Sequence, residues 1–255
     1  MLTSLSNPKI KEILRLKGKK QKAQSGKFII EGIHLLQEAI QSSSLYDIDQ
    51  VIFSSSFNQP DLLGQLRALE VSDQVFNKMT ELENPEGILA VLKSKSFSLE
   101  ELLKSNPKVT IFGVEIQDPG NLGAIFRTAE ALGADSIILS KGTVDPFNSK
   151  VVRASMGSIL RLPFCIIADA QDAIKTLKAK GFDVVGTHAK RGQNLREIEF
   201  SYPLVIVMGS ETRGLPEKLV DNITKFVKIP ISAKVDSLNV AMAAGIILYE
   251  AAKGK

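Results

Sequence analysis

Three short segments combine polar side chains with otherwise apolar sequence: residues 118–133, 205–216 and 229–250. Each follows or contains the end of an apolar stretch typical of a buried strand, and α/β sheets bind ligands in the loops at such strand ends. Guanidinium, carboxylate, amide and hydroxyl groups gathered there can bind, orient and polarise a ligand. The sequence therefore predicts one pocket built from five polar side chains: Asn121, Arg127, Glu211, Ser237 and Asn239.

The first segment, "GNLGAIFRTAEALG" over residues 120–133, is typical of a helix with Asn121 at its N-cap. On this helix Arg127 falls nearly opposite the apolar stripe, beside Gly123 and Glu130. One interpretation is a solvated arginine that pairs with Glu130. The other is close approach of a ligand or a second subunit, because this face is unusually bare and Gly123 costs a helix roughly 1 kcal/mol relative to alanine. The residues alone leave both open.

The other two segments follow strands. In "VIVMGSETRGLP" a buried strand ends at Gly209 and Glu211 lies in the turn, while Ser210 lacks the G-x-S-x-G frame of a nucleophile elbow. No G-x-G-x-x-G fingerprint follows the first strand of either half, so a classical dinucleotide site is unsupported. The last segment predicts a long closing helix with Ser237 as its N-cap. This prediction puts Asn239 inside a very apolar helix, where capping does not explain it.

Alternating strands and helices position these segments. The first part of the chain predicts strands at 27–32, 50–56 and 87–93 and helices at 33–40 and 59–69, a small α/β unit. A polar linker at 93–108 places a domain boundary near residue 100. Beyond it, continuous apolar strands separated by helices indicate a mainly parallel sheet covered on both faces, and hence the α/β class. These strands are 109–116, 135–140, 163–168, 182–189, 204–210 and 226–231.

Composition narrows the class of protein. With 44% apolar and 24% charged residues among 255, the chain is typical of a soluble globular protein. The single cysteine, Cys165, lies in an apolar run, which predicts a buried strand thiol, no disulfide framework and no metal site. No apolar run approaches the roughly 18 residues of a membrane helix, and the N-terminus lacks a signal-peptide core. We expect a cytoplasmic protein that makes no membrane contact.

Positive charge is concentrated at the N-terminus. Residues 1–28 carry a net charge of +7, against +4 for the whole chain. Such a run is either a solvated face or a nucleic-acid contact surface. The Asn-Pro helix start and the apolar residues Ile10, Ile13 and Leu14 slightly favour contact, because an ordered, docked basic helix can present phosphate ligands.

Together, "DPGNLGAIFRTAEALGA", "VMGSETRGLP" and "IPISAKVDSLNVAMAAGIILYE" resemble, in order and spacing, the three signature motifs of the SpoU/TrmH-type RNA 2′-O-ribose methyltransferases of the SPOUT superfamily. The intervening "VDPFNSKVVRASMGSILRLP" also resembles that family. The sequence around "GKFIIEGIHLLQEAI" is similar to the L30e-like substrate-binding domain that many members carry. The resemblance implies an L30e-like RNA-binding domain over residues 1–100 and a SPOUT catalytic domain over residues 101–255.

The resemblance also implies a homodimer, a deep trefoil knot at the end of the catalytic domain, and S-adenosylmethionine bound inside the knot. Knots are rare exceptions to the rule that chains do not thread loops. By motif position, the family's polar set falls on the five side chains named above, and its backbone contacts to the cofactor fall on Gly209, Ile229 and Leu238. No metal is implied. One departure is Ala233, where many relatives have glycine, and it bears on the cofactor loop.

The implied reaction moves a methyl group from S-adenosylmethionine to a ribose 2′-hydroxyl, the group that distinguishes RNA from DNA. Family accounts make the arginine a base, yet deprotonating it at pH 7 costs at least roughly 7 kcal/mol. Our hypothesis is that Arg127 binds the phosphate beside the target ribose and stabilises the developing alkoxide, using a planar fork that lysine lacks.

Several alternatives remain at the level of sequence. The extra N-terminal domain favours ribosomal RNA over transfer RNA by analogy only. A non-catalytic RNA-binding protein that keeps the fold is a second class, for which Ala233 is the only hint. A nicotinamide-dependent oxidoreductase is a third class, and the missing glycine fingerprint disfavours it.

Overall fold

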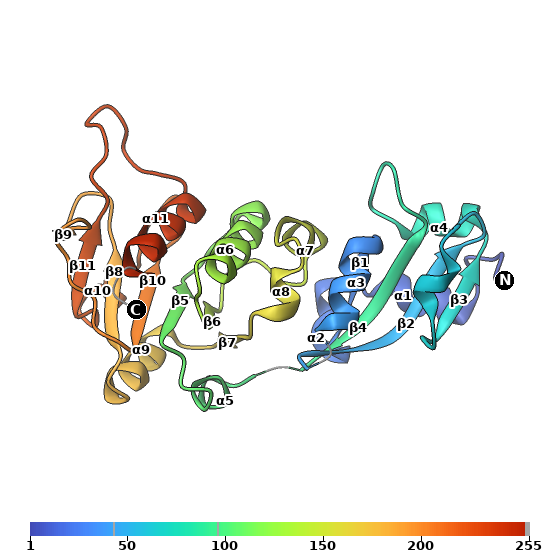
Figure 1. The fold of residues 1–255 in the computed structure, drawn as a ribbon, viewed down its shortest axis with the longest axis horizontal. Helices are drawn as coiled ribbons and strands as arrows, with labels where there is room; N and C mark the ends of the chain where they lie inside the picture. Colours follow the sequence, from blue (N-terminus) through green and yellow to red (C-terminus); the bar gives the residue numbers. More distant parts are fainter. Residues whose placement is uncertain (43, 96, 253–255) are drawn as a thin grey trace. The chain divides into compact units, whose positions relative to one another are not determined.

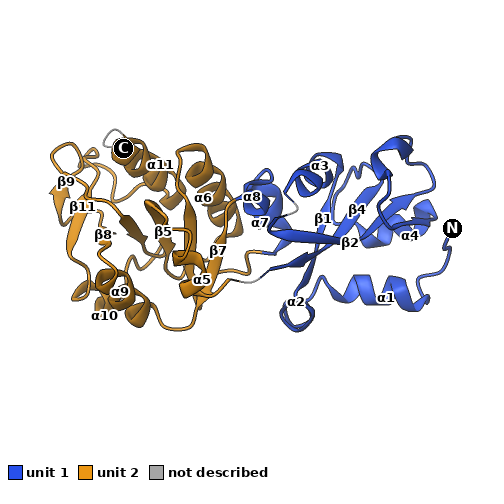
Figure 2. Ribbon diagram, turned by 60° about the horizontal axis from the view of Figure 1, so that its bottom comes forward, with its two compact units in different colours: residues 1–95, 147–161 blue, residues 96–146, 162–255 orange. Residues whose placement is uncertain are grey.

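The structure is a computed structural model that describes residues 1–42, 44–95 and 97–252. The chain divides into two compact units (Figure 2). Unit 1 comprises residues 1–95 and 147–161, and unit 2 comprises residues 96–146 and 162–255. The linker composition indicates a change of unit near residue 100, but nothing in the sequence indicates that residues 147–161 return to the first unit. The assignment of substrate binding to residues 1–100 and catalysis to residues 101–255 stays a prediction.

Unit 1 is built on a mixed sheet with the strand order β1-β4-β2-β3 (Figure 1). Strands β1 (Lys27–Glu31) and β2 (Tyr46–Ser54) pair antiparallel with β4 (Ile88–Ser94), and β3 (Ala68–Val71) pairs parallel with β2. The predicted strands of this unit and the helix at 33–40 are confirmed. Its helices are α1 (Pro8–Arg15), α2 (Lys19–Ser25), α3 (Ile33–Gln41), α4 (Asp73–Met79), α7 (Ser149–Ala154) and α8 (Ser158–Arg161).

The helix predicted at residues 59–69 is wrong. Only a single 3₁₀ turn, η1 (Pro60–Leu63), forms, and Gly64 ends it with a φ of +46°. The chain then enters β3, whose last residue, Val71, is completely buried. Leucine spacing here imitates a helix, but pairing with β2 and burial in the sheet core outweigh that local preference.

Helix α1 is ordered and docked, as the sequence predicts. The Asn7 side chain accepts a hydrogen bond from the Lys9 backbone N–H at 3.0 Å, which caps the helix. Ile10 and Ile13 are buried in the core of unit 1, and Leu16 rather than the half-buried Leu14 completes this face. Cationic side chains of this region are exposed and form what we call the N-terminal basic surface: Lys9, Lys11, Arg15, Lys17, Lys19 and Lys20.

Residues 147–161 are held in unit 1 by aromatic and polar contacts. The Phe147 ring stacks on the Phe28 ring with centroids 4.1 Å apart. The Tyr46 hydroxyl donates to the Ile159 carbonyl at 2.9 Å, and burial raises the pKa of Tyr46 well above its ordinary value. Because these partners are far apart in sequence, local pattern could not have predicted the contacts.

Unit 2 contains a seven-stranded sheet with the order β7-β6-β5-β10-β8-β11-β9, in which every neighbouring pair is parallel. The predicted parallel sheet and the α/β class are confirmed, whereas the short β9 was not predicted. The knot implied by the resemblance stays a prediction. The strands are β5 (Val109–Gly113), β6 (Ser136–Ser140), β7 (Phe164–Ile167), β8 (Asp183–Thr187), β9 (Gln193–Asn194), β10 (Leu204–Met208) and β11 (Lys225–Lys228).

Helices cover both faces of this sheet. Helices α6 (Pro119–Ala131) and α11 (Val240–Ala252) lie side by side on one face (Figure 1). Helices α5 (Leu99–Leu103), α9 (Ala170–Ala179) and α10 (Glu217–Val220) pack on the other face. Cys165 is buried in that second core, as predicted, and burial raises the pKa of its thiol to about 12. Among the described residues, no helix has the length and apolar character needed to cross a membrane.

Candidate active site

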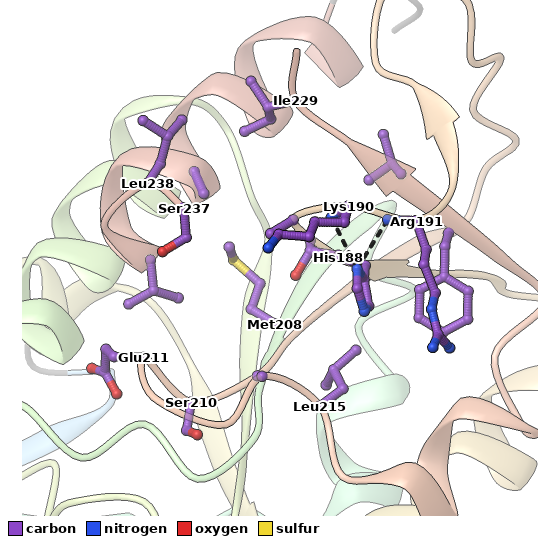
Figure 3. A pocket seen from close by; sticks show the side chains of 18 of the residues that line it. His188, Lys190, Arg191, Met208, Ser210, Glu211, Leu215, Ile229, Ser237 and Leu238 are labelled. Carbon is purple, nitrogen blue, oxygen red and sulfur yellow. Dashed lines mark hydrogen bonds between the residues drawn. The ribbon is translucent and has the colours of Figure 1, made fainter. Parts of the chain in front are cut away.

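A cavity of about 500 Å³ lies at the carboxyl ends of β8, β10 and β11, which are neighbours in the unit 2 sheet (Figure 3). This is the edge at which parallel α/β sheets bind ligands. Apolar side chains form much of its wall, including Met208 at the end of β10 and Leu215, Ile229 and Leu238 from loops. The volume lies within the roughly 300–1,000 Å³ typical of small-molecule and cofactor sites.

Five of the predicted site residues line this cavity: Gly209, Glu211, Ile229, Ser237 and Leu238. Asn121 and Asn239 do not line it, but hydrogen bonds connect both to Glu211. Arg127 neither lines the cavity nor joins this network. The structure therefore brings seven of the eight predicted residues together and leaves Arg127 apart from them in the single chain.

The three polar motif residues form a hydrogen-bonded relay. Asn239 Nδ2 donates to Asn121 Oδ1 at 2.7 Å, and Asn121 Nδ2 donates to Glu211 Oε1 at 2.9 Å. At its other end, Asn239 Oδ1 accepts the backbone N–H groups of Ala241 at 2.9 Å and Met242 at 3.3 Å. The relay thus runs from the start of α11 through α6 to the loop after β10.

The direction of the relay is fixed by the backbone. Because N–H groups of α11 occupy Asn239 Oδ1, the amide nitrogen must face Asn121, and only an acceptor fits at the far end. That acceptor is the Glu211 carboxylate. Partial burial raises the pKa of Glu211, but hydrogen bonds from Asn121 and from the backbone N–H groups of Gln117 and Asp118 hold it below its ordinary value.

Two predicted helix caps are wrong by a few residues. Asp118, not Asn121, caps α6 by accepting from the Asn121 backbone N–H at 2.8 Å, with Pro119 as the first helical residue. Asn239, not Ser237, caps α11, since its side chain accepts from the first turn. Asn239 therefore lies just before α11 and not inside it, and its role as the cap explains a polar residue at this position. Ser237 is exposed at the cavity, and its hydroxyl makes no hydrogen bond within the described part of the chain.

Gly209 is required by the folding of its own loop. A Cβ placed there would lie 2.2 Å from the Gly214 carbonyl carbon and 2.3 Å from the Leu215 nitrogen. The loop closes through backbone hydrogen bonds in both directions between Ser210 and Gly214, at 3.1 and 2.9 Å. This tight closure places Glu211 at its tip, where it meets Asn121.

Arg127 is exposed on α6, on the side opposite the buried residues Ile125 and Phe126. It makes no hydrogen bond or ion pair with any residue the structure describes. Close by, α11 packs tightly against α6, because a Cβ on Gly245 would lie 3.0 Å from Thr128 Cγ2. Arg127 is therefore available to a group outside its own chain.

The sequence did not identify the basic side of the cavity. His188, Lys190 and Arg191 follow β8 directly and line the cavity on the side away from Glu211 (Figure 3). His188 Nδ1 accepts the backbone N–H groups of Lys190 at 3.1 Å and Arg191 at 3.0 Å, so a neutral His188 carries its proton on Nε2. Burial and the Arg191 charge lower the His188 pKa. The signal available was polar sequence after a strand end, the same signal that marked the other segments.

The cavity suits a nucleoside-like cofactor. It combines apolar walls with backbone of the loops after β8, β10 and β11, at Ala189, Gly209 and Ile229. Within the described residues, no group of three or more histidine, cysteine, aspartate or glutamate side chains is arranged to hold a metal ion. The chemistry on offer is thus binding, orientation and electrostatics.

A parallel α/β sheet with a cofactor-sized cavity and a carboxylate-amide relay at its carboxyl edge defines a ligand-binding α/β enzyme domain. Residues 108–249 match the SpoU rRNA methylase family, and residues 7–90 match the MRM3-like substrate binding domain. The chain belongs to the SpoU rRNA methylase family. This confirms the methyltransferase class and the N-terminal substrate-binding domain that the motifs implied.

Three similar proteins match the chain over nearly its whole length. The chain is 33% identical to the 23S rRNA (guanosine(2553)-2′-O)-methyltransferase RlmP of Bacillus subtilis, over 97% of each protein. It matches the AdoMet-bound rRNA methyltransferase of Sinorhizobium meliloti with a TM-score of 0.89 and 33% identity, covering 99% of this chain and 97% of that one. A solved RNA 2′-O ribose methyltransferase matches with a TM-score of 0.82 and 30% identity, over 99% and 98% of the two chains.

Proposed function

We propose that the protein transfers a methyl group from S-adenosylmethionine to a ribose 2′-hydroxyl of ribosomal RNA. The observation that carries the proposal is the convergence of three distant family segments on one cavity, where the Asn239–Asn121–Glu211 relay ends. The relatives described above are ribosomal RNA methyltransferases and an RNA 2′-O ribose methyltransferase, which supports the substrate class. A ribosomal RNA substrate and a buried, reduced Cys165 fit a cytoplasmic enzyme.

S-adenosylmethionine, when bound, supplies an electrophilic methyl group on its sulfonium. Gly209, Ile229 and Leu238 hold it through their backbone atoms at the cavity wall, and the Ser237 hydroxyl contributes a donor from the loop before α11. Met208 and Leu215 exclude water from the same space. Positioning of this kind supplies several kcal/mol of barrier reduction without any proton transfer by the protein.

The relay gives Glu211 a fixed place and charge. Its carboxylate is held by Asn121 and two backbone N–H groups, so it stays ionised and in one position beside the cavity. An ionised carboxylate there complements the positive charge of the cofactor and orients the groups around the target ribose. Asn121 and Asn239 act through Glu211 as positioning residues.

Arg127 acts by charge and hydrogen bonding rather than as a base. The cost of at least roughly 7 kcal/mol for deprotonating an arginine at pH 7 argues against proton abstraction. Arg127 is exposed and free of partners among the described residues, so its guanidinium can bind the phosphate next to the target ribose and stabilise the alkoxide. Arg127→Lys retains the charge but loses the fork, and turnover should fall while RNA affinity changes little.

We further propose that the enzyme is a homodimer in which Arg127 completes the cavity of the partner subunit. Beside α6, helix α11 exposes the apolar side chains Met242, Ile246 and Tyr249, with 63%, 41% and 62% of their surfaces accessible. Their spacing of four and three residues puts them on one face of the helix. A contiguous apolar helix face next to an unpartnered arginine suits a two-fold interface with a second copy of this chain.

A mixing experiment tests whether Arg127 acts across the dimer. Arg127→Ala and Glu211→Gln are each expected to be inactive alone. After subunit exchange, about half of the dimers are mixed and each has one intact site, so about a quarter of wild-type turnover should return. Recovery of no activity, with mixed dimers verified by tag exchange, would place Arg127 at its own cavity. A protein that is active as a monomer would contradict the dimer itself.

The activity is tested with radiolabelled S-adenosylmethionine and unmodified ribosomal RNA, with unmodified transfer RNA in parallel. The RNA is digested to nucleosides and the labelled product is identified. We expect a 2′-O-methylnucleoside from ribosomal RNA that disappears with Arg127→Ala. Label in transfer RNA alone would reassign the substrate, and label on a base would contradict ribose methylation. Cofactor binding with no label in either RNA would favour the non-catalytic alternative.

A further inference from the structure

The basic side of the cavity has no role in the function proposed so far. Lys190 and Arg191 reach it from the loop after β8, and Arg213 reaches it from the loop after β10. Together they supply three positive charges to the lining, against the carboxylates of Glu211 and Glu217. Figure 3 places Lys190 and Arg191 across the cavity from Glu211, with Met208 between them. Lys190 and Arg191 therefore lie apart from the Glu211 carboxylate within the cavity.

The loop after β8 is a built structure and not a loose surface run. His188 Nδ1 accepts the backbone N–H groups of both Lys190 and Arg191, which folds the loop around the imidazole. At the far end Gly192, with a φ of +106°, packs so closely on β11 that a Cβ would lie 2.5 Å from the Phe226 carbonyl oxygen. Both ends are thus anchored, and the two cationic side chains start from fixed backbone positions.

Two of the three cations have no partner among the residues the structure describes. Arg191 and Arg213 are exposed and make no ion pair there. Lys190 Nζ contacts Asp236 Oδ1 at 3.2 Å, from side chains that are 74% and 95% exposed. A pair that exposed is worth little in water, so a stronger anion can replace Asp236 at low cost.

The charge of the two ligands decides which of them these side chains serve. S-adenosylmethionine carries a sulfonium and an ammonium against one carboxylate, so its net charge is positive. A cluster of cations therefore repels the cofactor as a whole. RNA carries a negative charge at every phosphate, and neutralising phosphates is the main electrostatic contribution to its binding. The ribose whose 2′-hydroxyl receives the methyl group is flanked by a phosphate on each side. When that ribose enters the cavity, these phosphates must lie at its mouth.

We propose that Lys190, Arg191 and Arg213 form a phosphate-binding rim that holds the RNA backbone beside the target ribose. The proposal rests on the proposed function, because it takes RNA as the ligand that enters this cavity. Asp236 is the resident counter-ion of Lys190 and competes with the RNA phosphate for it. The rim belongs to unit 2 alone and is separate in sequence from the N-terminal basic surface of unit 1.

The test compares RNA and cofactor binding in the double variant Lys190→Ala/Arg191→Ala. We expect unmodified ribosomal RNA to bind about tenfold more weakly, and the slope of log affinity against log salt to fall by roughly two, one for each lost phosphate contact. The dissociation constant for S-adenosylmethionine, measured by calorimetry, should be unchanged. Arg213→Ala, on a different loop, should lower the salt slope by about one.

Two matched variants sharpen the result. Arg196→Ala removes an exposed cation a few residues further along that does not line the cavity, and it should leave RNA affinity unchanged. Asp236→Asn removes the competing carboxylate and should strengthen RNA binding several-fold at low salt, the opposite direction from the rim variants.

Each remaining outcome is decisive. Unchanged RNA affinity and salt slope in the double variant overturn the rim. Weaker cofactor binding with normal RNA binding also overturns it and assigns the cations to the cofactor carboxylate. The rim variants could weaken RNA binding as expected while the wild-type protein transfers no methyl group. That result would contradict the proposed activity and leave the rim in place.

Discussion

At the scale of single residues, Asn239 links a helix cap to the proposed active site. Its oxygen satisfies the first turn of α11 and its nitrogen sets the direction in which Asn121 presents its amide to Glu211. One side chain therefore couples the start of a helix to the charge and position of a carboxylate two loops away. The coupling depends on which atom is a donor, so it can be broken without changing the shape of the residue.

Asn239→Asp tests this coupling. The carboxylate can still cap α11, so the free energy of unfolding should change by less than about 1 kcal/mol. It cannot donate to Asn121, whose amide must either lose that bond or turn its oxygen toward Glu211. We expect turnover to fall about tenfold or more, as for loss of a hydrogen bond that supports a charge. Steady-state kinetics and thermal denaturation measure the two effects.

Asn239→Ala is the comparison for that variant, because it removes the cap and the donor together. It should lose both turnover and about 1 kcal/mol of stability. In Asn239→Asp the pH profile of turnover should also move to higher pH, since Glu211 loses a donor that lowers its pKa. Wild-type turnover with an unshifted profile in Asn239→Asp would show that the relay plays no part in catalysis.

A second prediction at this scale concerns His188. Burial and Arg191 lower its pKa, and protonation of Nδ1 would break the bonds that it accepts from Lys190 and Arg191. The unfolded state therefore binds this proton more readily, so stability is present above the ordinary histidine pKa of about 6.5 and is lost as the pH falls below it. Denaturant unfolding at about pH 7.5 and about pH 5.5 should show a larger acid loss in the wild type than in His188→Asn. Equal losses of stability in the two proteins would contradict a contribution of His188 to the acid sensitivity.

Side-chain types at strand ends were enough to find most of the cavity. The rule that ligands bind at carboxyl ends of parallel strands selected Glu211 and Ser237, and the same rule applied to the sequence after β8 would have selected His188. The caps were misplaced because each helix start offers two good capping residues close together. These are Asp118 and Asn121 for α6, and Ser237 and Asn239 for α11. Only the hydrogen bonds distinguish them.

At the scale of elements, buried strands were the most predictable, and the errors concern a short turn, a short strand and a segment that returns to unit 1. The strands of unit 2 lie in a sheet covered on both faces, so they appear as continuous apolar runs such as residues 204–208. The helix predicted at residues 59–69 is wrong because the leucine spacing imitates a helix, whereas Gly64 ends the turn η1 and residues 68–71 pair with β2. The return of residues 147–161 to unit 1 depends on contacts such as Phe147 on Phe28, which no local pattern contains.

The loop after β10 gives a prediction at this scale. In Gly209→Ala the new methyl group would meet backbone atoms of Gly214 and Leu215 at 2.2 to 2.4 Å, and backbone cannot move aside as a side chain can. The loop must open, which costs about 1–3 kcal/mol and displaces Glu211 from Asn121. We expect lower thermal stability and a large loss of S-adenosylmethionine affinity, measured by calorimetry.

Gly214→Ala is the matched control in the same loop. A Cβ there meets nothing within 4 Å, so the only cost is a φ of +67°, about 1–2 kcal/mol for a residue with a side chain. Cofactor affinity should fall far less than in Gly209→Ala. If both variants bind the cofactor equally well, the close approach at Gly209 is not what shapes the site.

At the scale of the whole molecule, two separate groups of cationic side chains are candidates for RNA contact. The N-terminal basic surface lies on unit 1, and the proposed phosphate-binding rim lies on unit 2. The first was visible in the sequence because its charges are close together along the chain. The second was not, since Arg213 is distant in sequence from Lys190 and only the fold of unit 2 brings both to one cavity. An RNA that contacts both surfaces would show salt dependence from each.

The N-terminal basic surface is best tested by substitution. Removing residues 1–22 would also remove Ile10, Ile13 and Leu16 from the core of unit 1, so a truncated protein would lose stability as well as charge. Substituting exposed lysines leaves that core intact. The test variant is Lys17→Ala/Lys19→Ala/Lys20→Ala, and the control is Lys104→Ala/Lys175→Ala/Lys180→Ala, three exposed lysines of unit 2.

The three N-terminal lysines should contribute to RNA affinity through charge alone. If each contacts one phosphate, the salt slope of binding should fall by about three, and the affinity should fall alike for every RNA sequence. Cofactor affinity should be unaffected, because the cavity lies entirely in unit 2. The control variant lowers net charge by the same amount, so an equal loss in both would mean that RNA responds only to total charge. Unchanged RNA affinity in the N-terminal variant would show that the N-terminal basic surface is a solvated face.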